Sequence, residues 1–148
     1  MQNKQVSQQQ APSFFKLGAC LIYEALVVIA ILMVSTFIFM MLLGDAGQGW
    51  KRYLLQLWLL ISAGLYFVWS WHKSGHTLAM QTWQLQLLNQ NNQLLSVPVA
   101  IARYLLACLG LLTLGFGFLW VFLDHDRLFL HDRLLGSKLI YVPRNKAL

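Results

Sequence analysis

Three long apolar runs, residues 17–43, 54–71 and 99–123, constrain the fold of this chain more than any other feature. At about 1.5 Å per residue, helices of these lengths cross or nearly cross a hydrocarbon core about 30 Å thick. Charged residues make up only 11% of the sequence, whereas soluble domains contain about 25%. The sequence therefore predicts an all-α membrane fold of about three transmembrane helices in a lipid bilayer.

The rest of the chain divides simply. Residues 1–13 are polar and rich in glutamine, so we expect a disordered tail. Residues 14–148 are expected to form a single transmembrane domain. The net charge of +6 comes from Lys and Arg residues that flank the apolar runs. Anionic lipid headgroups attract such residues, so the charge gives no reason to expect nucleic acid as a partner.

The segment between the second and third runs changes its period. In residues 82–87, Trp and Leu alternate with Thr and Gln, as expected for a strand with two different faces. Asn residues in 89–92 favour a turn, and residues 93–96 are interpreted as a returning strand. We therefore predict a small β-hairpin at the membrane surface. Residues 138–142 also have strand character, and they are expected to pair with the hairpin if both lie on the same side.

Two charged residues interrupt the apolar runs. Glu24 lies about two turns into the first run, and Arg103 lies at a similar position in the third. A charge inside the membrane needs a partner, so we predict that the two side chains pair. One interpretation is a structural ion pair, and the other is a proton or cation site. Lys16, at the head of the first run, either snorkels to the interface or influences the protonation of Glu24.

The topology of the third run has two solutions. Gly110, Thr113, Gly115 and Gly117 lie in it, and small residues permit either close helix packing or a break. With three full spans and an inner N-terminus, the loop charges violate the positive-inside rule. Either the N-terminus lies outside, or the third run is re-entrant. We favour three full spans. The re-entrant alternative would bring Asp132 toward the two intramembrane charges and the last strand toward the hairpin.

Catalytic and metal signatures are not found. His125 and His131 are six positions apart, so a helix would place them on different faces. We therefore expect no metal site, and we interpret residues 124–134 as an interfacial segment with internal Asp–Arg pairing. The sequence has no nucleophile motif, P-loop or dinucleotide fingerprint, so we predict no enzyme activity and no cofactor. Cys20 and Cys108 lie in apolar runs and are interpreted as small buried hydrophobic residues.

Short motifs along the chain resemble those of the RDD family of small bacterial membrane proteins. A basic residue opens the first run and an acidic one follows eight positions later, here Lys16 and Glu24. Arg103 takes the place of an arginine that begins the family's next helix. Two further motifs match, one after the second run (Gly75, Thr77, Leu78, Met80, Trp83) and one near the C-terminus (His131, Asp132, Arg133, Leu134, Gly136, Ser137). The family's usual arginine and first aspartate are replaced by Lys16 and Glu24, so charge is kept while the guanidinium fork is lost.

The resemblance implies a multi-pass protein of the bacterial cytoplasmic membrane with a transport role, since some family members are linked to sodium–proton exchange. Under this hypothesis the chain acts as a homo-oligomer, with Glu24 as the carrier and Arg103 as its counter-charge. His131, Asp132, Arg133 and Lys16 would be supporting motif positions. The alternative is a non-transporting adaptor or assembly protein that binds a membrane protein partner or anionic lipid.

Overall fold

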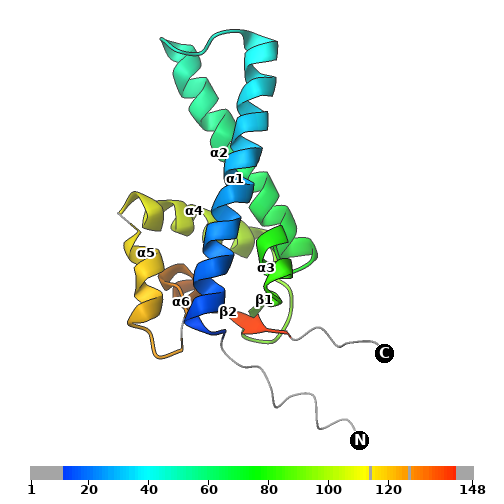
Figure 1. The fold of residues 1–148 in the computed structure, drawn as a ribbon, viewed down its shortest axis with the longest axis vertical. Coiled ribbons are helices and arrows are strands. Elements are labelled where there is room, and N and C mark those ends of the chain that lie inside the picture. Colours follow the sequence, from blue (N-terminus) through cyan, green and yellow to red (C-terminus); the bar gives the residue numbers. More distant parts are fainter. Residues whose placement is uncertain (1–11, 114, 127, 143–148) are drawn as a thin grey trace, which may run out of the picture.

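A long helical hairpin dominates the computed structural model, which describes residues 12–113, 115–126 and 128–142. Helices α1 (Phe14–Leu43) and α2 (Trp50–Lys73) form this hairpin and project from a smaller base (Figure 1). The Ser13 hydroxyl accepts a hydrogen bond from the backbone N–H of Lys16 and caps α1. The predicted tail, 1–13, lies almost entirely outside the described residues.

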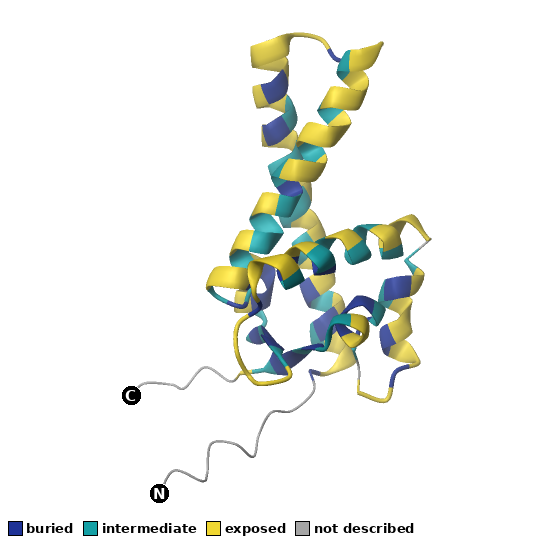
Figure 2. Cartoon of the chain, turned by 180° about the vertical axis from the view of Figure 1, so that it is seen from behind, coloured by how far each residue is buried: buried dark blue, intermediate teal, exposed yellow. Residues whose placement is uncertain are grey.

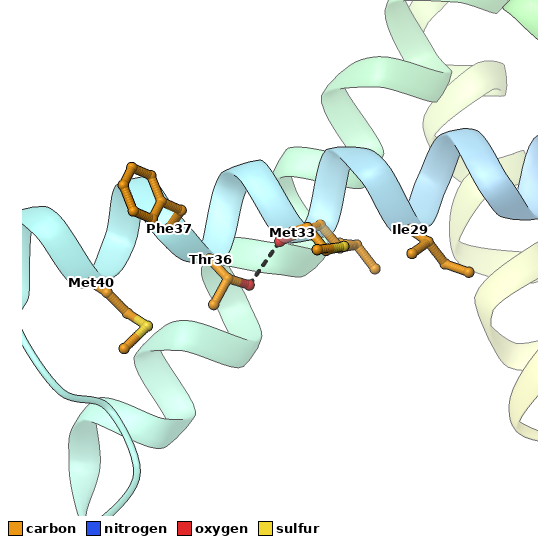
Figure 3. A pocket seen from close by; sticks show the side chains of 6 residues that line it. Ile29, Met33, Thr36, Phe37 and Met40 are labelled. Atoms are coloured by element: carbon orange, nitrogen blue, oxygen red, sulfur yellow. Dashed lines mark hydrogen bonds between the residues drawn. The ribbon is translucent and has the colours of Figure 1, made fainter.

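Both hairpin helices are long and apolar enough to cross a membrane. Most of their side chains are exposed, in contrast to the buried residues of the base (Figure 2). On the outer half of α1, an apolar groove of about 500 Å³ contains only side chains of that helix, and the Thr36 hydroxyl donates to the Leu32 carbonyl at 2.7 Å (Figure 3). Such surfaces are stable in lipid. Helices α1 and α2 contain the first two predicted spans, 17–43 and 54–71, and both helices are longer than predicted.

The third apolar run is broken. Helix α4 (Val97–Leu112) is followed by the short helix α5 (Phe116–Leu119) and a 3₁₀ turn, η2 (Trp120–Phe122), and the two parts meet at 105°. Gly115 adopts a φ of 78°, which favours glycine. Gly110 and Gly117 bring the two arms so close that a Cβ on Gly117 would lie 3.1 Å from the Gly110 Cα. The predicted third helix, 99–123, is thus a bent pair.

A two-stranded sheet closes the base. Helix α3 (Leu78–Thr82) leads into β1 (Leu85–Asn89), and helix α6 (Leu130–Leu135) leads into β2 (Ser137–Tyr141). The strands are antiparallel, with Leu87 opposite Leu139. Residues 93–96 are not a strand, so the hairpin prediction is wrong in its return strand. The expected strand near 138–142 takes that place, because its Leu139 and Ile140 are buried in the base.

The pairing of β1 with β2 constrains how the bent pair meets the membrane. β1 precedes α4 and β2 follows η2, and hydrogen-bonded strands must lie on the same side of a bilayer. The two ends of the bent pair therefore lie on the same side of a bilayer that the α1–α2 hairpin crosses, which agrees with the re-entrant alternative. Tyr104 on α4 donates its hydroxyl to the Leu60 carbonyl of α2 at 2.8 Å. Leu60 lies about 20 Å along α2 from the end of that helix at Lys73. The Tyr104 side chain of α4 therefore reaches the middle of α2 rather than its end.

The core lies in the base, where α1 begins and α2 ends. Leu17 and Cys20 of α1 and Trp71 of α2 pack there with the apolar faces of both strands. Outside this cluster, buried Phe39 of α1 packs against Trp58 of α2, and polar contacts join the same two helices. The Ser35 and Ser62 hydroxyls lie 2.8 Å apart, and the Trp58 indole N–H donates to the Ser35 carbonyl at 3.1 Å. The base therefore fixes how the charged residues of the membrane-embedded helices are placed.

Candidate functional site

Glu24 lies where α1, α2 and α3 meet. The Tyr66 hydroxyl donates to Glu24 Oε1 at 3.1 Å, and the Thr77 hydroxyl donates to Oε2. Thr77 is almost completely buried and also caps α3 by accepting the Met80 backbone N–H at 3.3 Å. The Leu78 backbone N–H donates to the Tyr66 hydroxyl at 3.3 Å. Two hydroxyl groups, each fixed by backbone contacts, therefore orient the carboxylate.

Among the described residues, no basic side chain forms an ion pair with the Glu24 carboxylate. The ion pairs among the described residues join Arg103 to Asp132 and Arg133 to Asp124, and neither involves Glu24. Arg103 interacts with Glu24 only through space. Glu24 is also only partly shielded, with an intermediate exposure. Its hydroxyl partners lower the cost of a charge, but they do not neutralise it.

Arg103 forms a bidentate ion pair with Asp132, between α4 and α6. Its Nε donates to Oδ1 at 2.6 Å, and a terminal guanidinium nitrogen donates to Oδ2 at 3.2 Å. The Ser137 hydroxyl donates to Oδ1 at 2.8 Å. The guanidinium carbon lies 4.1 Å from the centroid of the Trp71 ring, a distance typical of a cation–π contact. Both charged groups are buried, so each neutralises the other.

The same contacts set the protonation states of Asp132 and His131. Burial alone would raise the pKa of Asp132, but the charges of Arg103 and His131 and the hydrogen bonds from Arg103 and Ser137 hold it below its usual value. Burial lowers the pKa of His131 to about 4, with a further contribution from Arg103 and partial opposition from Asp132. His131 is therefore neutral at pH 7, stacked on Phe129 at 5.4 Å between ring centroids.

The predicted direct pair between Glu24 and Arg103 is not what the structure contains, since each side chain has other partners. The prediction used depth alone, counted from the two helix starts. Because the bend after α4 returns the chain, α6 places a second carboxylate, Asp132, beside Arg103. Asp132 approaches Arg103, as the re-entrant alternative anticipated, while Glu24 contacts neutral hydroxyls.

The remaining predicted residues lie around this base. The Lys16 ammonium lies 3.4 Å from the Tyr141 ring centroid, so it links α1 to β2. Arg133 pairs with Asp124, which matches the expected Asp–Arg pairing in this segment. Among the described residues, no group of three or more His, Cys, Asp or Glu side chains is placed to hold a metal ion.

Two aromatic residues at the site were missed by sequence reasoning. Tyr66 donates to Glu24, and Trp71 stacks under Arg103. Both lie in the second apolar run, 54–71. Their positions on α2 differ by five, so they do not share one face, and periodicity gives no signal that they are partners. A tyrosine inside an apolar run is itself a signal, because a buried phenol needs a hydrogen-bond partner.

Comparisons with known proteins add one match. The family model described as the RDD family matches residues 12–136, which is most of the chain. No curated protein and no solved structure matches. The matched range includes every charged residue discussed above, from Lys16 to Arg133.

Proposed function

Because the chain belongs to the RDD family of membrane proteins, we propose that it is an ion exchanger in which Glu24 takes up and releases a proton or a small monovalent cation. The observation that supports this is the difference between two carboxylates, Glu24 and Asp132. Asp132 is fully buried and held by Arg103. Within the described part of the chain, the hydrogen-bond partners of Glu24 are two hydroxyl groups, and its side chain remains partly accessible.

The physical argument rests on the cost of a bare charge. A carboxylate within an apolar helix is stable only when something neutralises it. For Asp132 that partner is permanent, so it is unsuited to exchange. Glu24 has no permanent cationic partner among the residues that the structure describes, so a proton or a monovalent cation from solution is the natural partner. An ion exchanger requires a carboxylate whose bound proton or cation can be released and replaced, and Glu24 meets this requirement in our proposal.

The basic residues give the orientation that we propose. The sequence has eleven Lys and Arg residues. Only Lys51 and Arg52 flank the loop that joins α1 to α2, and Arg103 is buried in its ion pair. The other eight lie before α1 or in its first turn, at the last residue of α2, or after the bent pair. The positive-inside rule then puts the β1–β2 end in the cytoplasm, with the α1–α2 loop outside. In a bacterium this membrane is the inner membrane.

A pathway through the membrane needs more than one copy in this proposal. The long helices α1 and α2 expose most of their side chains along their length (Figure 2). Two such helices and a bent pair are too few to enclose an ion pathway. We therefore propose that several copies of the chain form the pathway together as a homo-oligomer. The exposed apolar faces of α1 and α2 are available for this association.

Reconstitution provides the test. Purified protein in sealed liposomes with an internal pH-sensitive dye should move protons when a sodium, potassium or lithium gradient is applied. Glu24→Gln keeps the size and hydrogen-bonding capacity of the side chain and removes its charge, so it should abolish the flux. Asp45→Asn, which changes an exposed carboxylate in the α1–α2 loop, is the matched control. Equal flux from wild-type protein and Glu24→Gln would refute the proposal and leave the adaptor hypothesis.

A further inference from the structure

A groove of about 720 Å³ opens at the β1–β2 end, and its lining includes Tyr23, the residue before Glu24 on α1. It is bounded by Tyr23 of α1, by α3, and by the residues at the start of β1 and the end of β2. The lining residues are Tyr23, His76, Leu78, Gln81, Thr82, Gln84, Leu85, Gln86 and Val142. Since water occupies about 30 Å³ per molecule in the liquid, the groove has room for on the order of twenty waters.

The lining suits water and hydrated ions. Three glutamines, a threonine, a tyrosine and a histidine provide both donors and acceptors, and no Lys, Arg, Asp or Glu is among them. Lys16, the basic residue at the start of α1, holds its ammonium over the Tyr141 ring. The uncharged polar lining of the groove can solvate a cation without repelling it. It also does not bind the cation as tightly as a carboxylate would. The groove is therefore suited to passage rather than to tight binding.

The groove adjoins residues that help to hold the Glu24 carboxylate in place. Leu78 lines the groove, and its backbone N–H donates to the Tyr66 hydroxyl, which donates to Glu24 Oε1. Tyr23, on the other wall, directly precedes Glu24 on α1. The exposed Gln81 lies at the groove on α3, the helix capped by Thr77. One side chain or one hydrogen bond therefore separates the groove from the partners of Glu24.

The outer half of α1 offers no comparable route. The groove there is lined by apolar side chains and Thr36, whose hydroxyl is bonded to its own helix (Figure 3). Water and ions are not stable at such a surface in lipid. Access to Glu24 from the β1–β2 end is thus the polar route that the described residues provide.

We infer that the groove between Tyr23, α3 and the two strands is a water-filled entrance that leads hydrated cations and protons to Glu24 from the β1–β2 side of the membrane. This inference rests on the proposed function for the identity of the cargo, but the accessibility of Glu24 is measured without transport. Gln81 is then an entrance residue, since a large side chain there would close the path.

A water-soluble carbodiimide, which modifies accessible carboxyl groups, is the probe. It is added to one side of sealed vesicles that contain the full-length protein, and modified residues are located by mass spectrometry. Asp126, which is exposed after η2, reports reagent on the β1–β2 side, and Asp45 reports the opposite side. Glu24 should be modified together with Asp126. Gln81→Trp should slow modification of Glu24 at least about tenfold, equivalent to about 1.4 kcal/mol in the barrier. Asn91→Trp, in the exposed turn after β1, should not slow it.

The outcomes separate the two proposals. Modification of Glu24 at an equal rate in wild-type protein and Gln81→Trp overturns the entrance, as does modification of Asp126 without Glu24. Modification that Gln81→Trp slows, in a protein that moves no ions after reconstitution, keeps the entrance and refutes the exchanger. Both variants are at exposed positions, and Thr82→Trp offers a second way to obstruct the groove if Gln81→Trp reduces expression.

Discussion

Arg103 donates hydrogen bonds to both carboxylate oxygens of Asp132, although 29 positions separate the two residues. Arg103 lies on α4, and Asp132 lies beyond the bend on α6. A guanidinium presents its donors in a fixed planar fork, so a bidentate pair fixes orientation as well as distance. The pair therefore ties the two sides of the bend together inside the base.

Removing one partner of this pair should be costly. Asp132→Asn or Arg103→Met leaves a buried charge uncompensated, and we expect a loss of about 3–5 kcal/mol in the free energy of unfolding. The double variant Arg103→Met with Asp132→Leu removes both charges, so it should recover much of that loss. Unfolding in mild detergent measures both. Arg52→Gln, at an exposed position near the α1–α2 loop, serves as a control and should change stability little. Single and double variants of equal stability would contradict the role of the pair.

The stability of the base should fall with acid before Asp132 titrates. His131 has a pKa of about 4 in the folded chain and about 6.5 when unfolded. Between these values the unfolded chain binds the extra proton, so stability is present above pH 6.5 and is lost toward pH 4, by up to about 3 kcal/mol. The contribution of Asp132, whose pKa is also lowered, is lost only below its unfolded value of 3.8.

His131→Phe isolates this effect. Phenylalanine keeps the stacking on Phe129 and cannot take up a proton. Thermal unfolding in detergent at several pH values between 4 and 7 should give a flatter profile for this variant than for wild-type protein. Parallel profiles would mean that His131 does not titrate in this window.

The strand pairing predicts where each loop lies. With Cys20 and Cys108 replaced by alanine, single cysteines at Lys73 and Val142 should react with a membrane-impermeant thiol reagent from the same side. A cysteine at Gln48, in the α1–α2 loop, should react from the other side. All three positions are exposed in the structure. Labelling of positions 73 and 142 from opposite sides would contradict the re-entrant arrangement.

The close approach of Gly110 and Gly117 should not tolerate a side chain. A Cβ on Gly117 would meet the Gly110 backbone at 3.1 Å, and backbone cannot move aside as a flexible side chain does. We expect Gly117→Val to separate the arms of the bent pair and lower the unfolding temperature in detergent by several degrees, as for a loss of about 1–3 kcal/mol. Gly18→Ala, where an added Cβ has no atom within 4 Å, is the control and should be neutral or mildly stabilising.

The parts of the fold that local patterns determine could be predicted. Apolar length and the scarcity of charge predicted α1 and α2, and alternation predicted a strand near residues 82–87. The pairing of that strand depends on contacts about fifty positions away, which local periodicity does not report. Residues 93–96 were the nearest candidate for a partner, whereas β2 offered the buried residues Leu139 and Ile140.

For the candidate site, the sequence indicated the charged residues but not their partners. Glu24 and Arg103 stood out because a charge inside an apolar run is rare. Their partners depend on the 105° bend, and glycines and a threonine in the sequence permit either a bend or close packing. Thr77 was named only as a motif position, and its contact with Glu24 follows from the placement of α3 against α1. Depth along a helix was therefore a poor guide to which charges meet.

The long separation of β1 and β2 also has a consequence for biogenesis. Helices α1 and α2 are complete before β1 leaves the ribosome, and each can enter the bilayer on its own apolar length. The sheet cannot form until Tyr141 has been synthesised, because β2 is the last described element. Until then, α4 and the segment after the bend lack both the strand partner and the carboxylate that hold them. The nascent chain thus passes through a stage in which its hairpin is inserted and its base is open, and the base closes when β2 pairs with β1.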